Sequence, residues 1–450
     1  MLLTDRRWKA CAIRKLYADL MLTLPRHGKK LKALENLVAC SDAQFKTSSA
    51  LSVLPERLTL DSYVPRIEEP RNAITSIELA KKHQREDDSL NTLLRLLLAK
   101  IPRNSLKSFM YVQLTWPLPW ADSNLLIHSW AHEFAMEAET MLTLARHHGE
   151  SLEHVSLRAR KGNWISHCTI GGLRSLQLEF LFTIKTTARM VYRNRDTLRH
   201  LGIGLEARIF EAFHHEDLYH EILDDPQQDL SEMFTHTLSD FDKDSESQAP
   251  MLKLESLKMI GLDLRLMLCG HSLLEGPSRV RPIIDLQNLA SLSIESCSFL
   301  GRALPLLARK SRDDSVNNLP NLRSLTIRSE KSHRLRSSSL ASFLCALSPL
   351  KILRVLFSGR GVLPRLSDIL PIHGATLEIL VWEDRLGRRG ILESDGIPIH
   401  EECDIVRRGR DIAKYCRNLV ELGIAVEWEY DKDKVATGLE DVWLLDLYTS

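Results

Sequence analysis

The residues best suited to binding a metal ion lie in one acidic stretch, HHEDLYH, which contains His214, His215, Glu216 and His220. Zinc-binding helices place two histidines four residues apart so that both rings lie on one face. His215 and His220 are five residues apart, which places their rings about 140° apart around a helix. We therefore interpret this stretch as the solvated face of a helix and predict no zinc site.

Other spacings that could support chemistry are also incomplete. Asp242, Asp244 and Glu246 alternate like the start of a calcium-binding loop, but the glycine and the final glutamate of such a loop do not follow. The glycines of LGIGLEA and SGRGVLP lack the spacing and the lysine of a phosphate-binding loop, and no Gly-x-Ser-x-Gly motif is present. We predict no metal, no cofactor and no enzymatic activity. An enzyme built from scattered residues is the alternative.

Charge gives little reason to expect a nucleic-acid partner. The formal net charge is +1, whereas nucleic-acid-binding domains usually carry a positive excess. Arg385, Arg388 and Arg389, together with the arginines of 407–410, form a basic C-terminal stretch. We interpret these residues as a solvated surface and keep nucleic-acid binding as a less favoured alternative.

The sequence favours the cytoplasm or the nucleus over secretion. The eight cysteines form no Cys-x-x-Cys pair, and no Asn-x-Ser/Thr glycosylation site is present. No apolar run has the length needed to cross a bilayer, and Arg6, Arg7 and Lys9 interrupt any apolar stretch at the N-terminus.

One hydrophobic pattern, Leu-x-x-Leu-x-hydrophobic, recurs along most of the chain. Its two-residue spacing is typical of a short strand that follows a buried leucine. The nine clearest copies begin at Leu152, Leu173, Leu198, Leu254, Leu289, Leu322, Leu350, Leu377 and Leu419. Weaker copies at Ile74 and Leu106, and strand-like segments near Leu20 and Leu58, raise the predicted number to about thirteen strands. A unit this short must stack on its neighbours to bury its apolar face.

Helical periodicity fills many of the intervals between copies. Examples are SLNTLLRLLLAKI, GRALPLLARK, SLASFLCAL and CDIVRRGRDIAKYC. Another helical segment ends at His147 and His148, whose side chains would interact favourably with the C-terminal end of the helix dipole. Alternating strands and helices predict right-handed crossovers and parallel strands. The predicted fold is therefore an α/β, leucine-rich-repeat-like solenoid, with a parallel β-sheet on the concave face and helices on the convex face. The alternative is a two-domain α/β protein with a leucine bias.

The predicted solenoid spans residues 25–450 and contains one acidic insertion. Residues 211–247 contain twelve Asp and Glu against Lys243 alone, and they separate two copies that lie 56 residues apart. We predict a helix to about Leu223 and then a poorly ordered insertion over 224–250.

The N-terminal segment RRWKACAIRKLYADLMLT, residues 6–23, resembles the closing helix of an F-box. The resemblance rests on Arg7 and Trp8, a stretch of small residues, and then Leu16 and Tyr17 ahead of the first repeat. With the repeats that follow, the chain resembles fungal-type F-box/leucine-rich-repeat proteins, with residues 1–24 as the F-box remnant. This resemblance implies a substrate receptor of an SCF ubiquitin ligase, with the Skp adaptor and cullin as partners. An equally supported interpretation is that Trp8 and Tyr17 cap the first repeat.

The opening part of the F-box, which contacts the adaptor, has no counterpart in the sequence. We expect either that it has been lost or that the protein is a stand-alone leucine-rich-repeat scaffold.

The predicted binding surface is the concave face, where the residues between the core leucines would point. Most of these residues are small or polar. Two neighbouring strands differ, and we predict a protein-recognition patch there, unless a loop or the C-terminal tail covers it. The patch residues are Ile352, Arg354, Leu356, Ile379, Val381 and Glu383. Trp116 and Trp120, in the rigid segment WPLPW, are a second candidate contact, although packing against the next helix is the commoner role of such residues.

Overall fold

The computed structural model of the 450-residue chain places fifteen stretches. They are residues 19–24, 35, 56–63, 73–114, 137–158, 170–179, 184–204, 252–262, 264, 284–297, 300–313, 319–329, 337–357, 363–384 and 402–424.

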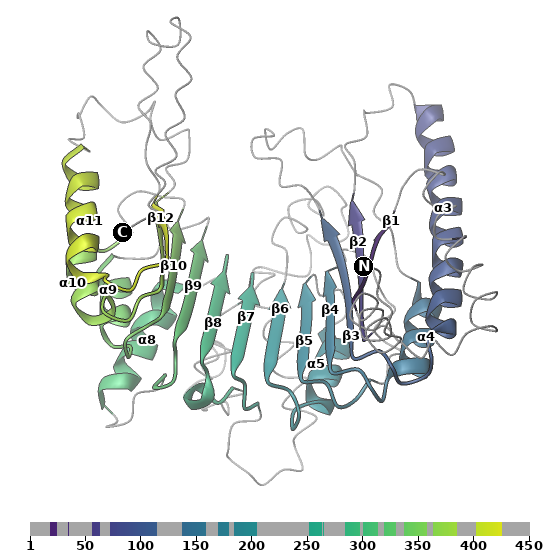
Figure 1. The fold of residues 1–450 in the computed structure, drawn as a ribbon, viewed down its shortest axis with the longest axis horizontal. Coiled ribbons are helices and arrows are strands. Elements are labelled where there is room, and N and C mark those ends of the chain that lie inside the picture. The colour runs from purple at the N-terminus through teal and green to yellow at the C-terminus, as the bar shows by residue number, and fades with distance from the viewer. Residues whose placement is uncertain are drawn as a thin grey trace, which may run out of the picture.

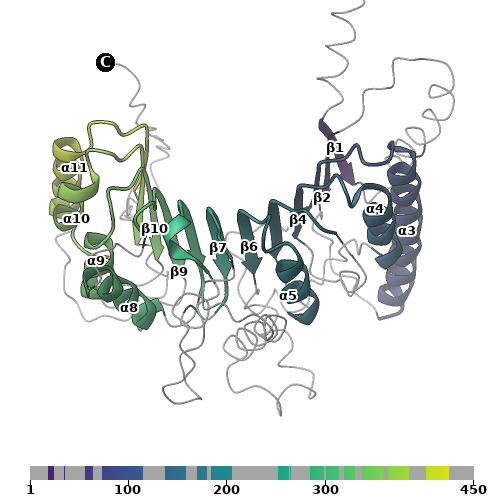
Figure 2. The same ribbon diagram turned by 90° about the horizontal axis from the view of Figure 1, so that it is seen from below.

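A single parallel β-sheet of twelve strands runs through these residues (Figure 1). Each strand pairs with the strand before it in the sequence, so the spatial order is the same as the chain order. The strands are β1 (Asp19–Leu24), β2 (Arg57–Tyr63), β3 (Ser108–Leu114), β4 (His154–Arg158), β5 (Ser175–Glu179), β6 (His200–Gly204), β7 (Ser256–Ile260), β8 (Ser291–Glu295), β9 (Ser324–Ser329), β10 (Ile352–Phe357), β11 (Ile379–Asp384) and β12 (Glu421–Ile424). This order is consistent with a solenoid, as is the curvature of the sheet in Figure 2.

Helices lie on the outer side of that curve, and the sheet lines the inner side (Figure 2). They are α3 (Ala73–Lys100), α4 (Ala138–His148), α5 (Ile184–Arg193), α8 (Leu300–Asp313), α9 (Ser337–Cys345), α10 (Leu366–His373) and α11 (Glu402–Tyr415), with a short 3₁₀ turn, η4 (Leu286–Asn288), before β8. No helix in the placed stretches is long and apolar enough to cross a membrane.

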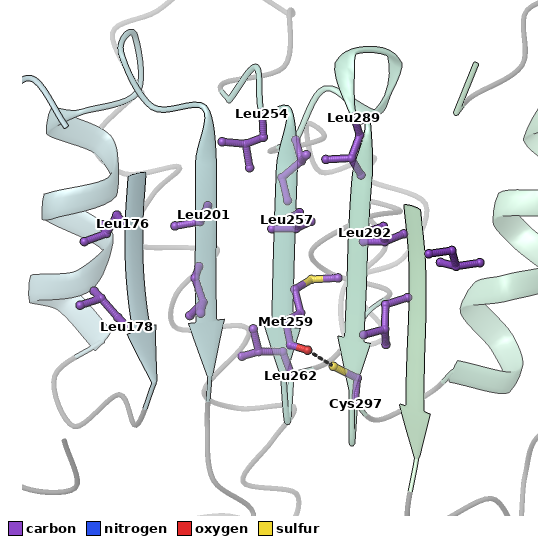
Figure 3. Packing of buried hydrophobic residues seen from close by; sticks show 14 of the residues in the cluster. Leu176, Leu178, Leu201, Leu254, Leu257, Met259, Leu262, Leu289, Leu292 and Cys297 are labelled. Carbon is purple, nitrogen blue, oxygen red and sulfur yellow. Dashed lines mark hydrogen bonds between the residues drawn. The ribbon is translucent and has the colours of Figure 1, made fainter. Parts of the chain in front are cut away.

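The core lies between the sheet and the helices, and aligned leucines build it. The parallel register places Leu257, Leu292, Leu325, Leu353 and Leu380 side by side on successive strands, and each is at most 1% exposed. Figure 3 labels the first two residues of this row, Leu257 and Leu292. The two-residue spacing of apolar residues, which predicted strands in the sequence, therefore places those residues on one buried face of the sheet.

Cys297 belongs to the same core. Its Sγ donates to the Met259 carbonyl oxygen at 3.5 Å, the dashed contact in Figure 3, and burial raises the pKa of the thiol to about 12.

The nine clear copies of the pattern all contain a strand, as do the segments near Leu20, Leu58 and Leu106. The strand predicted at Ile74 is wrong, because ITSIEL forms the first turns of α3. Ile74 and Ile77 are three residues apart and so fit a helical face as well as a repeat. No Gly or Pro interrupts the next 23 residues of α3, so the helix continues through the segment.

The helices predicted between copies are confirmed where the structure covers them. SLNTLLRLLLAK forms the C-terminal part of α3, and α8 includes GRALPLLARK. SLASFLCAL and CDIVRRGRDIAKYC lie mostly within α9 and α11, which end at Cys345 and Tyr415. The acidic insertion at 224–250 lies outside the described residues.

Candidate functional site

The inner face of the sheet presents every second residue of each strand. In β10 the first, third and fifth positions are half-buried and the intervening positions are buried, and β7 and β8 show the same alternation. None of the helices in the placed stretches covers this side (Figure 2). Among the described residues, the inner-face side chains are therefore the side chains of the sheet that no helix packs against.

The six residues of the predicted patch occupy adjacent positions on β10 and β11. The register pairs Ile352 with Ile379, Arg354 with Val381, and Leu356 with Glu383. All six are half-buried. Four apolar side chains therefore form one block that neither the core nor a described helix encloses.

An ion pair crosses this block. The Arg354 Nη2 atom, on β10, lies 3.6 Å from the Glu421 Oε2 atom, on β12. Because β11 lies between these two strands, the pair must pass over it. Both side chains are more than a third exposed, so solvent screens the pair and its contribution to stability is about 0–1 kcal/mol. The ion pair can therefore open to admit a partner at little cost.

The middle of the inner face is small and polar. Ser256, Ser291 and Ser324 are neighbours in register on β7, β8 and β9. Beside them, Lys258 Nζ lies 3.3 Å from Glu295 Oε1. This agrees with the prediction that most inner-face residues are small or polar. The apolar block on β10 and β11 therefore differs from the middle of the inner face.

Gly202 occupies an inner-face position of β6, but it is buried. A Cβ atom at this glycine would lie 2.9 Å from Cγ of Gln177, its neighbour on β5. The side chain of Gln177 therefore covers the glycine, which offers no surface to a partner.

A second polar set, which the sequence analysis missed, lies at the edge where the strands begin. The residue immediately before most strands is charged, and several neighbours pair. Lys107 lies 3.6 Å from Glu56, Arg174 lies 3.5 Å from Glu153, and Lys351 lies 2.6 Å from Glu378. The available signal was the charged residue that follows the first leucine in many copies.

Buried polar side chains also recur six residues before three strands, and these too were missed. His148, Asn194 and His373 occupy this position ahead of β4, β6 and β11. Asn194 Oδ1 accepts from the Leu173 N–H at 2.9 Å, and His373 Nδ1 accepts from the Leu350 N–H at 3.2 Å. Asn194 and His373 thus each hold the leucine that enters the preceding strand.

The role predicted for His148 is wrong. Burial lowers the pKa of His148, so its ring is uncharged near neutral pH and contributes no charge to the dipole of α4. Its Nε2 atom instead lies 3.2 Å from the Leu98 carbonyl oxygen, which ties α4 to the end of α3.

A hydroxyl three residues further on completes each of these sites. Ser151, Thr197 and Thr376 donate to the carbonyl oxygens of Leu106, Leu173 and Leu350, at 2.7, 2.9 and 2.7 Å. The sequence signal was a Ser or Thr directly before the first leucine of a copy. These contacts fix the register of the strands and so the spacing of the inner-face residues.

Several predicted residues lie outside the described residues. They include Trp116 and Trp120, the F-box resemblance at Arg7, Trp8, Leu16 and Tyr17, and the histidines of HHEDLYH. Within the stretches that the model places, no group of three or more His, Cys, Asp or Glu residues is arranged to hold a metal ion.

Neither a scan against protein-family models nor a search of curated proteins found a match for this chain.

Proposed function

We propose that this protein is a non-enzymatic recognition module that binds a protein partner on the inner face of its sheet. The observation that carries the proposal is the block of Ile352, Leu356, Ile379 and Val381, which are half-buried on two adjacent strands. Apolar groups flanked by charges are typical of the centre and rim of a protein interface.

We further propose that the strand–helix units form a leucine-rich-repeat-like solenoid. Sequential parallel pairing, one buried leucine row and helices on the outer side all support this interpretation. In such a fold the inner-face residues can differ from repeat to repeat, while the buried leucines maintain the stacking of the repeats. This architecture supports recognition by the inner face.

The preferred partner has apolar side chains with at least one charged group beside them. Arg354, Glu383 and Glu421 surround the apolar block and offer charges of both signs. A purely polyanionic ligand would find no excess positive charge on the chain, which carries a net charge of +1. Weak, salt-insensitive retention on heparin would agree with this, whereas steep salt dependence would favour nucleic acid.

Affinity purification with quantitative mass spectrometry tests the site. Leu356→Asp and Val381→Asp should each deplete the same partner at least about tenfold, because a charge would be buried in an apolar contact. Ser156→Asp, on the inner face of β4, is the matched control and should retain the partner. A partner retained by both patch variants would contradict the site.

The fold must survive these substitutions for the result to count. Leu356→Asp should unfold at nearly the wild-type temperature, because Leu356 is half-buried and points away from the core. Val355→Asp should unfold the protein, because Val355 is fully buried. If Leu356→Asp also unfolds the chain, the patch belongs to the core and the proposal is wrong.

The link to a ubiquitin ligase is a proposal that rests on the F-box resemblance of residues 6–23. Recovery of the Skp adaptor and a cullin in the same purification would support the substrate-receptor role. Recovery of the patch-dependent partner without them would favour the stand-alone scaffold.

A further inference from the structure

The ion pair between Arg354 and Glu421 runs diagonally across the inner face. The register pairs Arg354 on β10 with Val381 on β11, and Val381 with Gly423 on β12. Because the residue directly in line on β12 is a glycine, it offers no side chain to the arginine. Glu421, two residues before Gly423, lies beside Ile379 in the register. Arg354 therefore reaches its counter-ion only by crossing β11 at an angle.

This crossing requires the arginine side chain to be extended. Two strand spacings are about 10 Å and two residues along a strand are about 7 Å, which places the Cα atoms of Arg354 and Glu421 about 12 Å apart. The Nη2 and Oε2 atoms of the pair are nevertheless 3.6 Å apart, so the side chains bridge most of this distance. The apolar stem of Arg354 therefore lies over β11, where Ile379 and Val381 face inward. In this position the stem covers part of the apolar block.

The two ends of the ion pair differ in their surroundings. The side chain of Arg354 is 38% exposed and that of Glu421 is 55% exposed. Arg354 also lies between two register neighbours, Thr326 on β9 and Val381 on β11. A less exposed charge is screened less by water and gains more from a well-placed counter-ion. Glu421 can therefore return to solvent at lower cost, whereas Arg354 needs a replacement partner when the pair opens.

We propose that Glu421 occupies the place of a carboxylate that belongs to the partner. In this inference, which rests on the proposed function, the recognised segment of the partner contains an Asp or Glu beside apolar side chains. Its carboxylate accepts two parallel N–H groups from the guanidinium of Arg354. The hydroxyl of Thr326, about 5 Å away in the register, is a further donor. Glu421 is released as this contact forms.

Displacement of Glu421 uncovers apolar surface at the same time. As the guanidinium of Arg354 turns toward the partner, the arginine stem leaves Ile379 and Val381, and apolar side chains of the partner pack there. Glu421 is thus an internal competitor that the partner displaces by supplying both a charge and apolar groups. This requirement selects against segments that are only apolar or only acidic.

A partner that carries a cation would act differently. Its positive group would pair with Glu421 and leave Arg354 without a counter-ion beneath the contact. Removing one half of an ion pair in this way is unfavourable when the contact excludes water. The structure therefore favours the acidic partner, and selection of a basic partner is an outcome that would overturn the proposal.

Chemical labelling tests the internal contact without any partner. Phenylglyoxal modifies accessible guanidinium groups, and peptide mapping by mass spectrometry follows each arginine separately. Glu421→Gln should speed the modification of Arg354 by about two- to fivefold, because an exposed ion pair is weak. Arg323, which is exposed where β9 begins, is the internal control and should react at an unchanged rate. An unchanged rate at Arg354 would overturn the proposal, because Glu421 would not hold it in solution.

Random dodecapeptides displayed on phage supply the probe for the binding step. They are selected on the full chain and counter-selected on Leu356→Asp, so the retained peptides are those that need the apolar block. We expect the retained peptides to contain an Asp or Glu beside apolar residues. Enrichment of Lys or Arg, or the absence of any charge preference, would overturn the proposal.

Fluorescence polarisation of one retained peptide then assigns the contact to Arg354. Replacing the acidic residue of the peptide by its amide should raise the Kd for the wild-type chain at least about fivefold, but should leave the Kd for Arg354→Met unchanged. Glu421→Gln should lower the Kd by about two- to fivefold, and should have no effect in combination with Arg354→Met. Glu378→Gln, whose carboxylate pairs with Lys351 instead, is the matched control and should leave the Kd unchanged. An equal loss for the amide peptide in Arg354→Met would contradict the contact.

The two proposals can fail separately. If no selected peptide depends on Leu356, the apolar block is not a binding site and both proposals are wrong. If the peptides depend on Leu356 but not on Arg354, the proposed function stands and this inference fails. A thermal melt checks that Arg354→Met and Glu421→Gln remain folded, which we expect because both side chains are more than a third exposed.

Discussion

His373 makes hydrogen bonds that only an uncharged imidazole can make. Its Nδ1 atom accepts from the Leu350 N–H at 3.2 Å, so the proton is on Nε2, which donates to the Leu344 carbonyl oxygen at 3.1 Å. Burial lowers the pKa of His373 from its ordinary value of 6.5, and burial lowers that of His148 in the same direction. Both residues bind protons more readily in the unfolded chain.

The free energy of unfolding should therefore depend on pH. The stabilisation from both histidines is fully present above a pH of about 6.5 and is lost as the pH falls through the folded-state pKa values. Urea denaturation between pH 5 and 8 should show stability rising with pH. His373→Asn, which copies the residue at Asn194, should flatten that slope. An unchanged slope would mean that His373 does not titrate on unfolding.

The hydroxyl of Thr376 should contribute measurably to stability. It donates to the Leu350 carbonyl oxygen at 2.7 Å and lies 3.0 Å from that of His373. Thr376→Val should lower the free energy of unfolding by about 1–2 kcal/mol, measured by urea titration. Thr376→Ser keeps the hydroxyl and should lose less. Equal losses in the two variants would show that packing, not the hydrogen bond, is responsible.

The cysteines should differ in reactivity according to their burial. Burial raises the pKa of the Cys297 thiol to about 12, so almost no thiolate forms at neutral pH. Cys345 is exposed. Iodoacetamide should label Cys345 in the native protein and Cys297 only after denaturation, as followed by peptide mapping. Native labelling of Cys297 would show that the core opens around β7 and β8.

At the scale of elements, Asn91 joins α3 to α4. Its Oδ1 atom accepts from the Glu137 N–H and from the Thr140 hydroxyl, both at 2.9 Å. Asn91→Ala would leave these buried donors unpaired and should lower the free energy of unfolding by about 1–3 kcal/mol. Thr92→Ala, on the exposed side of α3, is the control and should change stability by less than about 0.5 kcal/mol. Similar losses in both variants would show that the hydrogen bonds of Asn91 do not account for the effect.

The sequence predicted the strands well because each depends on local spacing. In the copies that begin at Leu350 and Leu377, the apolar residues two positions apart are the ones that form the buried face of the strand. The same six-residue window failed at Ile74, because it cannot separate a strand from the start of a long helix such as α3. The contacts of His373 were beyond prediction, since its partners lie 23 and 29 residues earlier in the chain. The ion pair between Arg354 and Glu421 was missed for a similar reason, because it spans a whole strand.

The patch residues could be chosen from the sequence, since strand alternation fixes which side chains share a face. The exposure of these residues could not be predicted, because it depends on side chains of the neighbouring strands. Gly202, which the side chain of Gln177 covers, is an example. Whether the six residues bind a partner stays a prediction.

At the scale of the whole molecule, the segment between β6 and β7 should be dispensable for the fold. These two strands pair directly, and the Glu255 N–H donates to the Arg199 carbonyl oxygen at 2.8 Å. The length of the connection affects stability only slowly. Deleting residues 224–250 should therefore leave the Tm nearly unchanged in a thermal melt.

Leu257→Ala provides the comparison, because Leu257 is fully buried and its truncation should lower stability by about 2–5 kcal/mol. A fall in Tm for the deletion as large as for Leu257→Ala would show that the segment is part of the folded core.

The strictly sequential pairing of the strands also determines how the molecule should respond to a mechanical load. Neighbouring strands are held by hydrogen bonds that run along the stack, and each strand contacts mainly the ones on either side. A force that pulls the two ends of the stack apart therefore acts on one strand pair at a time, so the pairs should separate one after another. In an optical trap, the chain should lengthen in a series of small steps from its ends inward, at lower force than a sheet in which all strands are sheared together.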